Sequence, residues 1–259
     1  MISVVIPTLN EERFLGVLFE SLAAQVISEP LEIIVADNYS TDRTREVVKA
    51  FTGRFERLTI VDGGSPAVGR NAGALSGSGD PIFFLDADLE LRDSHFLANN
   101  VNYFRERDLA AATVRLSPLS GRWCDHVLVS LYNGILLPAA LIRRPLGSMC
   151  IAAARSVFNV VGGYPEDVAI SEDHDFAQRC VRIGRYGILP IRAHFSVRRL
   201  EREGRIPLCL KYIKASYLRT FRGPIREFDY EFGCFGNQGD LEPSYSDLSK
   251  GKRRNDIRA

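Results

Sequence analysis

Short apolar runs alternate with longer segments of helical periodicity along the N-terminal part of the chain. Residues 2–6 form a β-branched run that stops at Pro7, and this run predicts a buried strand. Similar runs at 31–36, 58–61 and 81–85 predict three more strands. Strands that alternate with helices imply right-handed βαβ units and a mainly parallel sheet.

The segments between these strands predict helices. The first helix is expected to open within residues 8–12, where Thr8 or Asn10 caps it and acidic side chains suit its positive end. Apolar residues at helical spacing then continue to Leu22. The other helices expected in this part of the chain cover 40–51 and 68–75.

The pattern loosens after residue 93. Ser171 is expected to cap a helix that reaches Ile183 and ends at Gly184. The remaining expected elements are helices at 94–107, 123–141 and 207–220, strands at 110–116, 146–154 and 188–192, and a polar tail at 250–259.

Polar clusters follow three of the predicted strands. They occupy residues 7–11, 37–42 and 86–88. In sheets of this kind, ligands bind beyond the carboxyl ends of the strands. We therefore expect the three clusters to converge on one site.

Composition places the chain among ordinary globular proteins. Apolar residues make up 46% of the 259 residues and charged residues 25%. A net charge of +1 provides no field that would steer nucleic acid, so we expect no nucleic-acid partner. The longest apolar stretch, 131–142, is interrupted and falls short of the ~20 residues that a spanning helix needs.

The cysteines and the N-terminus favour a cytoplasmic protein. Met1 runs directly into the first predicted strand, without the basic region and cleavage site of a signal peptide. The cysteine count is odd and no pair has the CxxC spacing of a zinc or redox site, so we expect reduced, mostly buried thiols. The five cysteines are Cys124, Cys150, Cys180, Cys209 and Cys234.

Asp86 and Asp88 follow a predicted buried strand, with only Ala87 between them. Carboxylates placed in this way can share a divalent cation with a diphosphate, and hard oxygen ligands suit Mg²⁺ or Mn²⁺. An isolated Asp-x-Asp is more often a solvated turn. Its place at a strand end favours the metal site.

The same segments resemble the family 2 glycosyltransferases of the GT-A fold. The resemblance implies a nucleotide-sugar donor, inversion at the anomeric carbon, and a Rossmann-like, mainly parallel sheet flanked by helices. It also implies a GT-A domain at 1–200, with a donor half at 1–92 and an acceptor half at 93–200. A small helical extension and polar tail then occupy 201–259. The motifs are VVIPTLNE (4–11), IVADNYSTD (34–42), GRNAG (69–73), FLDAD (84–88), GGY (162–164) and SED (171–173).

The resemblance assigns the donor site residue by residue. Asp37 matches the acid that binds the base, typically uracil, so a UDP-sugar is the expected donor, with GDP and dTDP left open. Tyr39 departs from the small residue that is commoner at its position. Asp88 is the expected direct ligand of Mn²⁺ or Mg²⁺, and Asp86 is expected to face the ribose or sugar, through water or the metal. The other donor-binding matches are Pro7, Leu9, Glu11, Arg70, Asn71 and Ala87.

Glu172 and Asp173 match the Glu-Asp pair of the family. Asp173 is assigned as the general base that takes the proton of the acceptor hydroxyl, and Glu172 as a group that binds the acceptor or supports the base. Without the surrounding motifs, both acids would read as helix-start residues that interact with the macrodipole.

Three residues further along the chain have two possible roles each. In many relatives a histidine near His194 completes the metal site or contacts phosphate, and a polar core or surface histidine is the alternative. Arg198 and Arg199 resemble a segment that closes over the diphosphate, and a basic surface turn is the alternative.

The acceptor is the least readable part of the sequence. The apolar stretch 127–142, the pair Arg143-Arg144 and the basic tail at 252–254 would suit a protein resting on the inner face of a membrane with a lipid-linked acceptor. A glycan acceptor, with a core helix and a disordered tail, is the alternative. Oligomeric state stays open.

Two other functions compete with glycosyl transfer. A sugar-phosphate nucleotidyltransferase would carry a Gly-rich, lysine-containing loop where residues 7–13 read PTLNEER. A degenerate domain that only binds nucleotide or glycan is disfavoured by the intact Asp86, Asp88 and Asp173.

Overall fold

The computed structural model describes residues 1–168, 170–223 and 225. One eight-stranded sheet runs through this part of the chain in the order β3-β2-β1-β4-β7-β6-β8-β5. The strands are β1 (Ile2–Thr8), β2 (Leu31–Asp37), β3 (Arg57–Asp62), β4 (Ile82–Leu85), β5 (Leu89–Glu90), β6 (Leu109–Leu119), β7 (Cys150–Ala153) and β8 (Arg185–Ser196). The helices are α1 (Leu15–Ala23), α2 (Thr44–Ala50), α3 (Pro66–Ser76), α4 (Phe96–Glu106), α5 (Trp123–Leu141), α6 (Arg155–Val161), α7 (Glu172–Ile183), α8 (Arg198–Arg202) and α9 (Arg205–Arg222).

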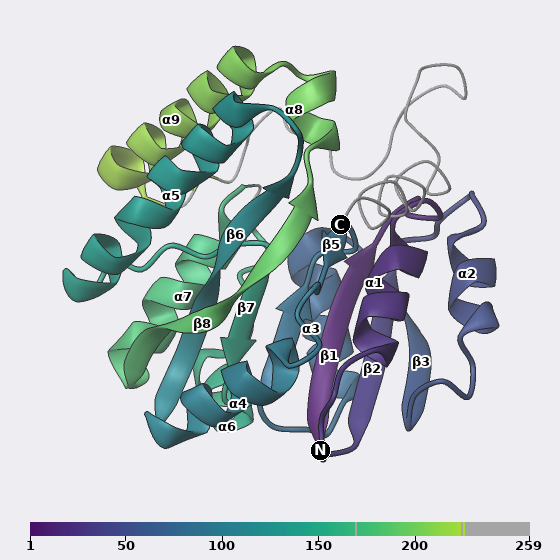
Figure 1. The fold of residues 1–259 in the computed structure, drawn as a ribbon. Coiled ribbons are helices and arrows are strands. Elements are labelled where there is room, and N and C mark those ends of the chain that lie inside the picture. The colour runs from purple at the N-terminus through teal and green to yellow at the C-terminus, as the bar shows by residue number, and fades with distance from the viewer. Residues whose placement is uncertain (169, 224, 226–259) are drawn as a thin grey trace, which may run out of the picture.

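The predicted mainly parallel sheet is confirmed in its N-terminal half. Strands β3, β2, β1 and β4 are all parallel, as βαβ units require. Strand β7 is antiparallel to both of its neighbours, β4 and β6, while β6 and β8 are parallel again. The carboxyl ends of β1 and β4 therefore lie side by side at one edge of the sheet (Figure 1).

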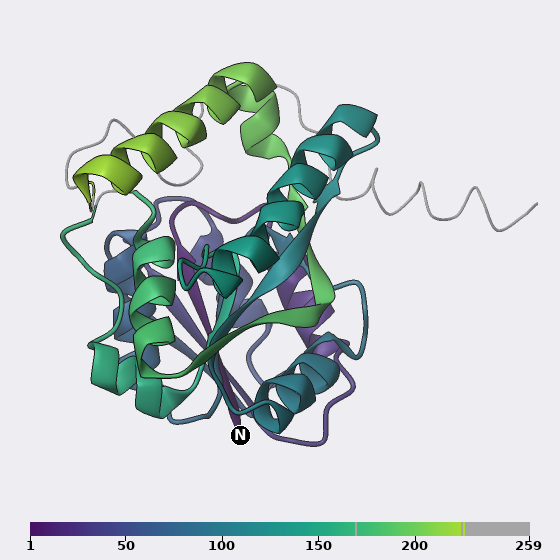
Figure 2. The ribbon, with the colours of Figure 1, turned by 90° about the vertical axis from the view of Figure 1, so that its left-hand side faces the viewer.

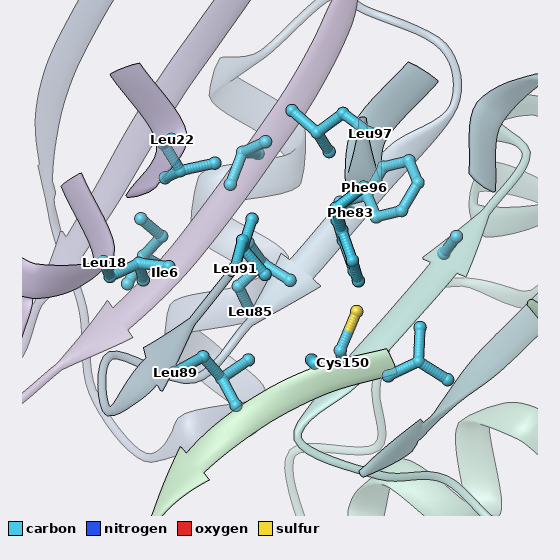
Figure 3. Packing of buried hydrophobic residues seen from close by; sticks show 14 of the residues in the cluster. Ile6, Leu18, Leu22, Phe83, Leu85, Leu89, Leu91, Phe96, Leu97 and Cys150 are labelled. Atoms are coloured by element: carbon cyan, nitrogen blue, oxygen red, sulfur yellow. The ribbon is translucent and has the colours of Figure 1, made fainter. Parts of the chain in front are cut away.

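Successive residues of the central strands bury their side chains on opposite faces of the sheet. Phe83 packs with α1 and α4 on one face, whereas Phe84 packs with α3, α6 and α7 on the other. Figure 3 shows the first of these layers, in which Leu18 and Leu22 of α1 approach the strands. The strands are buried on both faces, so they read as continuous apolar runs in the sequence.

Helix α1 begins later than expected. It starts at Leu15, Phe14 precedes it, and no side chain caps it. Residue Asn10 has a φ of 56°, and its side-chain oxygen accepts a hydrogen bond from the backbone N–H of Thr41 at 2.9 Å. The prediction that Thr8 or Asn10 caps a helix was wrong, because these side chains connect the ends of β1 and β2 instead.

Two predictions near α7 and β8 also need correction. Ser171 does precede α7, but its φ is 64° and its side chain makes no capping bond. Strand β8 runs to Ser196, because its pairing with β6 continues to Leu119. His194 therefore lies within a strand and does not follow one.

Helix α5 follows β6 and runs back over the sheet, whereas α9 extends away from the end of β8; Figure 2 shows the two helices diverging from the end at which Asp125 of α5 contacts Arg205 of α9. Helix α5 has 19 residues and a mean hydropathy of 1.3, with 17% of its apolar window buried, so by length and composition it could cross a membrane. This corrects the expectation drawn from the shorter run 131–142. Cys234 and the basic tail at 252–254 lie outside the described residues.

Candidate active site

A cleft of about 1830 Å³ lies at the carboxyl ends of β1 and β4. Its walls come from segments far apart in the sequence: the loop after β1, the turn after β4, the start of α7 and the segment around α8. Helices α5 and α9 extend the same cleft with apolar side chains. Two of the three predicted polar clusters, at 7–11 and 86–88, therefore meet in one cavity, and Asn38, Thr41 and Asp42 of the third line it as well.

The turn after β4 is held by backbone hydrogen bonds on both sides. The N–H of Asp86 donates to the carbonyl of Met149 at 2.9 Å, and the carbonyl of Asp88 accepts from the N–H of Ser196 at 3.0 Å. Asp88 is only 7% exposed, yet it lines the cleft. These bonds fix the direction of the acidic turn without using its carboxylates.

Arg198 bridges two acids that lie far apart in the sequence. Its guanidinium donates to both carboxylate oxygens of Glu11, at 2.7 and 2.8 Å. Its Nε lies 3.1 Å from Oδ2 of Asp88. Bidentate pairing of this kind is the strongest hydrogen-bonded form of an ion pair. The positively charged guanidinium of Arg198 therefore lies between Glu11 and Asp88 in the cleft.

Two carboxyl groups in this part of the cleft have raised pKa values. Burial raises the pKa of Glu11 to about 7, against the lowering effect of Arg198 and with a further rise from the neighbouring Asp88. Burial likewise raises the pKa of Asp86 to about 6, although Arg70 opposes the shift. Groups whose pKa values are displaced in this way by burial and like charge are typical of functional sites.

The acidic turn fits a divalent cation. Mg²⁺ and Mn²⁺ commonly take one or two protein carboxylates and complete their shell with substrate phosphates and water. Asp86 and Asp88 both line the cleft and supply such oxygens. Among the residues that the structure describes, no three His, Cys, Asp or Glu side chains are grouped closely enough to hold a metal by themselves.

Arg70 connects the acidic turn to α7. Its two terminal nitrogens contact Glu172 Oε1 at 2.6 Å and Asp86 Oδ1 at 2.8 Å, and its guanidinium lies over the ring of Tyr164 at 5.2 Å. Arg70 is 6% exposed, so these partners satisfy a buried charge. Arg70 lines the cleft, as predicted for a donor-site residue, but its hydrogen bonds orient protein carboxylates.

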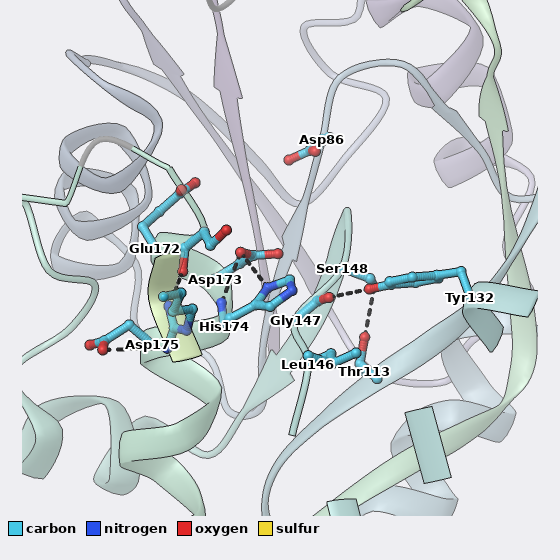
Figure 4. A network of polar contacts seen from close by, with 12 residues as sticks. Asp86, Thr113, Tyr132, Leu146, Gly147, Ser148, Glu172, Asp173, His174 and Asp175 are labelled. Atoms are coloured by element: carbon cyan, nitrogen blue, oxygen red, sulfur yellow. Dashed lines mark hydrogen bonds and ion pairs between the residues drawn. The ribbon is translucent and has the colours of Figure 1, made fainter. Parts of the chain in front are cut away.

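Asp173 points into the cleft from the first turn of α7 (Figure 4). Its Oδ1 accepts hydrogen bonds from the backbone N–H and lies 2.8 Å from the ring Nδ1 of His174. Burial alone would raise the pKa of Asp173, but His174 and then Arg70 lower it to about 2. Asp173 is therefore ionised at neutral pH.

The loop before β7 allows α7 to come this close. A Cβ added at Gly147 would lie 2.6 to 2.8 Å from the backbone and Cβ of Asp173. The carbonyl of Gly147 accepts a hydrogen bond from the hydroxyl of Tyr132, and the hydroxyls of Ser148 and Thr113 lie 2.6 Å apart (Figure 4). Sequence reasoning missed this loop, because residues 146–154 were assigned to a strand. A glycine beside a serine within that run was the available signal.

Two of the predicted donor residues do not line the cleft. Asp37 is fully buried, and its carboxylate accepts hydrogen bonds from the side chains of Ser40 and Arg45. Asn71 uses its amide to bind the backbone N–H and carbonyl of Tyr164 at 2.7 and 2.9 Å. A Cβ at Gly163 would come within 2.4 Å of Asn71 Oδ1, so this contact accounts for the second glycine of the Gly-Gly-Tyr motif.

The structure also does not bring His194 to the acidic turn. His194 pairs with Glu90 of β5, its Nδ1 is buried without a hydrogen-bond partner, and it does not line the cleft.

Tyr39 has a φ of 52°, a region that favours small residues. The remaining predicted donor residues, Pro7, Leu9, Ala87 and Arg199, all line the cleft.

Comparison with known proteins agrees with this architecture. Residues 3–144 match the family described as glycosyl transferase family 2. A PGL/p-HBAD biosynthesis glycosyltransferase of Mycobacterium bovis is 28% identical over 186 residues, which cover 70% of this chain and 69% of that protein. A 4,4'-diaponeurosporenoate glycosyltransferase of Staphylococcus haemolyticus is 36% identical over 100 residues, but these cover only 37% of this chain and 26% of that protein.

Solved structures share the fold. TarS of S. aureus in complex with UDP-GlcNAc superimposes with a TM-score of 0.63 at 21% identity, over 75% of this chain and 58% of the TarS chain. The mannosyltransferase PcManGT of Pyrobaculum calidifontis, in complex with GDP-Man and Mn²⁺, gives a TM-score of 0.62 at 22% identity, over 84% of this chain and 61% of that chain. The chain thus spans less than two thirds of either solved structure.

The family match covers more than half of the described fold and includes the turn after β4 and the helix that carries Arg70. The expected GT-A architecture, with its mainly parallel sheet flanked by helices, is confirmed by the solved structures. The chain belongs to glycosyl transferase family 2.

Proposed function

We propose that the protein is an inverting glycosyltransferase that moves a sugar from a nucleotide-sugar, in the first place a UDP-sugar, to a hydroxyl acceptor. The observation that carries this proposal is the placement of Asp173 in the same cleft as Asp86 and Asp88. One half of the cleft can neutralise a departing diphosphate, and the other half carries an ionised carboxylate. Inverting transfer needs these two functions on opposite sides of the reacting carbon.

The donor binds over the acidic turn in this proposal. The family match and the UDP-GlcNAc and GDP-Man complexes of TarS and PcManGT support a nucleotide-sugar donor. Arg198 and Arg199 line this part of the cleft and supply charge-assisted hydrogen bonds to phosphate oxygens. Asp37 is buried behind the cleft and holds Ser40 and Arg45, so it would act on the base indirectly, by fixing the segment whose Asn38, Thr41 and Asp42 line the cleft.

Asp88 and Asp86 would hold Mn²⁺ or Mg²⁺ together with the donor's diphosphate. The cation would neutralise charge on the leaving diphosphate. The Mn²⁺ present with GDP-Man in PcManGT supports this assignment. Arg198 lies against Oδ2 of Asp88, so Asp88 would bind a cation through its other oxygen or after Arg198 has moved toward the diphosphate.

Asp173 accepts the proton of the acceptor hydroxyl as that oxygen attacks the anomeric carbon and the diphosphate leaves. His174 holds one carboxylate oxygen at 2.8 Å, which fixes the orientation of the base. Glu172 is bound to Arg70 at 2.6 Å and keeps the start of α7 in register with Asp86. We assign Glu172 to positioning and Asp173 to proton transfer.

We place the protein at the cytoplasmic face of a membrane, with an acceptor that is lipid-linked or a growing glycan. The exposed apolar face of α5 supports this placement. The similarity to a 4,4'-diaponeurosporenoate glycosyltransferase and to a PGL/p-HBAD biosynthesis glycosyltransferase is consistent with it.

A donor screen tests the proposal. The protein is incubated with UDP-, GDP- and dTDP-sugars in Mn²⁺, and release of the nucleoside diphosphate is measured. We expect release from one donor class, and a loss of roughly 100-fold or more in Asp173→Asn for transfer to an acceptor. Full transfer by Asp173→Asn would contradict the assignment of the base. Release of pyrophosphate in the presence of a nucleoside triphosphate and a sugar phosphate would indicate a nucleotidyltransferase instead.

A further inference from the structure

Helix α5 presents an apolar face to solvent over its whole length. Its exposed polar side chains are few, His126 and Ser130, and its acid, Asp125, is fully buried. Continuous exposed apolar surface of this kind marks an interaction site in a soluble domain. The large apolar residues exposed on and just after α5 are Trp123 (77%), Val127 (46%), Leu131 (66%), Ile135 (51%), Leu137 (51%), Leu141 (74%) and Ile142 (71%).

Partly buried polar contacts hold α5 in this orientation. Asp125 forms a bidentate ion pair with Arg205 of α9, at 2.7 and 3.0 Å. Asn133 donates to the carbonyl of Leu116 at 2.8 Å and accepts from its backbone N–H at 2.9 Å. The helix is therefore fixed to β6 and α9 by its polar side, and its apolar side faces outward. Contacts along one side of an amphipathic helix suit a helix that rests on a membrane surface.

The exposed face continues into the catalytic cleft. Leu131 and Ile135 of α5, together with Leu208 and Ile213 of α9, line the same cavity as Asp173. Ile213 is 65% exposed, so the apolar groove is open to solvent. An apolar molecule that lies along α5 would therefore lead directly to the general base.

Cationic residues flank the apolar face. Arg122 stands immediately before α5, Arg143 and Arg144 follow it, and Lys214 is exposed on the neighbouring α9. Anionic headgroups match an apolar strip bordered by cations. Two copies of α5 packed together would instead bring cations against cations, with no exposed acid on the helix to offset them. The charge pattern therefore favours a lipid surface over a second copy.

We propose that α5 and α9 seat the protein on an anionic membrane surface, and that the acceptor is a membrane amphiphile whose apolar part lies in the groove between these helices. Its hydroxyl group then reaches Asp173 from the membrane side. The acceptor part of this inference rests on the glycosyltransferase function proposed above, whereas the membrane contact does not.

The chain's single tryptophan provides a direct test. Trp123 is 77% exposed at the start of α5. Addition of vesicles of phosphatidylglycerol and phosphatidylcholine should shift its emission to shorter wavelength, and brominated phospholipid in the same vesicles should quench it. Unchanged emission, with all protein left in the supernatant after sedimentation of the vesicles, would overturn the membrane contact.

Matched variants locate the contact. Each of these exposed leucines would gain transfer free energy when it enters the membrane. The double variant Leu131→Gln, Leu141→Gln should therefore lower vesicle partitioning by roughly 100-fold. The control double variant Leu75→Gln, Val160→Gln removes side chains that are 75% and 68% exposed on α3 and α6, and should change partitioning less than about twofold. Equal loss in both double variants would overturn the assignment to α5. A second result would also overturn it: a wild type that binds no vesicles and is a dimer by light scattering, together with a monomeric Leu131→Gln, Leu141→Gln variant.

The acceptor is tested separately from the membrane contact. Sugar transfer to a dodecyl glycoside is compared with transfer to the matching methyl glycoside, and we expect a KM at least tenfold lower for the longer chain. Equal KM values would overturn the apolar acceptor. The Asp88→Asn variant should bind vesicles as the wild type does. Failure of donor turnover would therefore count against the proposed transfer reaction and leave the membrane contact standing. Failure of vesicle binding would count against the membrane contact and leave the transfer reaction standing.

Discussion

At the scale of single residues, Arg198 links two acids at the place where the metal site is proposed. It contacts Asp88 at 3.1 Å and both oxygens of Glu11, so it supplies positive charge where a divalent cation and a diphosphate are proposed to bind. A divalent cation would compete with Arg198 for Asp88, and a diphosphate would compete with Glu11 and Asp88 for the guanidinium of Arg198. Donor and metal should therefore favour each other's binding, since a diphosphate that draws Arg198 away leaves both oxygens of Asp88 to the cation.

Glu11 should make stability depend on pH. Its pKa in the folded chain, about 7, lies above the ordinary value of 4.5, so the folded chain binds more protons than the unfolded chain between these values. Stability should therefore fall as pH rises from about 4.5 to 7, by on the order of 1–3 kcal/mol. Urea unfolding at a series of pH values should show this slope. Glu11→Gln should flatten it between about pH 6 and 7, above the pKa of about 6 of Asp86, which adds a slope of the same sign at lower pH. The exposed Glu56→Gln serves as control, and an unchanged slope between pH 6 and 7 in Glu11→Gln would refute the assignment.

The acidic residues of the site were predictable from sequence, whereas their partners were not. Asp86 and Asp88 could be placed because they end a buried strand, and Asp173 because it opens a helix inside an ordered series of motifs. The contacts of Arg70 and Asn71 could not be foreseen, since their partners, Glu172 and Tyr164, lie about a hundred residues further along the chain. Local pattern carries no information on such pairs.

At the scale of elements, the approach of α7 to the loop before β7 sets the position of the proposed base. Gly147 has no Cβ to hold α7 away, and the hydroxyl of Tyr132 in α5 fixes its carbonyl. Helix α5, which is proposed to bind the acceptor, and helix α7, which carries the proposed base, therefore contact the same loop. A displacement of either helix should change the position of Asp173.

A methyl group at Gly147 should separate these elements. In Gly147→Ala the new Cβ would lie 2.6 Å from the backbone of Asp173, so α7 must shift. We expect kcat for transfer to fall by roughly 100-fold, because a displacement of about 1 Å is enough to misalign a catalytic group. Nucleotide binding, measured by calorimetry, should change little. Gly121→Ala is the matched control, since a Cβ there meets nothing within 4 Å. Wild-type kcat in Gly147→Ala would contradict this account.

The ion pair between α5 and α9 should contribute to stability. Asp125 is fully buried, and Arg205 has a side-chain exposure of 20%. Asp125→Ala leaves a partly buried cation without its partner, so the free energy of unfolding should fall by about 1–3 kcal/mol. Arg43→Ala, which removes an exposed pair with Glu12, should cost less than about 1 kcal/mol in the same urea titration. Equal losses in the two variants would show that α9 is held by other contacts.

Element types were easier to predict than element ends. The strands of the parallel half were found because they are buried on both faces and read as apolar runs. The start of α1 was misplaced because Asn10 and Glu11, which look like helix-start residues, bond across to the β2–α2 segment. The extension of β8 to Ser196 depends on pairing with β6, and nothing local to residues 193–196 signals it.

At the scale of the whole molecule, the sheet places two different surfaces at one cleft. The parallel half contributes a polar, acidic wall from the ends of β1 and β4, and the mixed half contributes the apolar helices α5 and α9. A net charge of +1 gives no overall attraction to a membrane or to a nucleotide. Both proposed ligands must therefore be recognised by local charge, the donor by Arg198 and Arg199 and the membrane by the cations that flank α5.

The central claim is that Asp88 helps to hold a divalent cation against the diphosphate of a nucleotide. Calorimetry of UDP binding to the wild type and to Asp88→Asn, each with Mn²⁺ and with EDTA, tests it most directly, with Asp93→Asn as the exposed control. We predict that binding to the wild type and to Asp93→Asn weakens at least tenfold in EDTA, and that binding to Asp88→Asn is weak in both conditions. UDP affinity that is the same in all three proteins, with and without Mn²⁺, would contradict the claim.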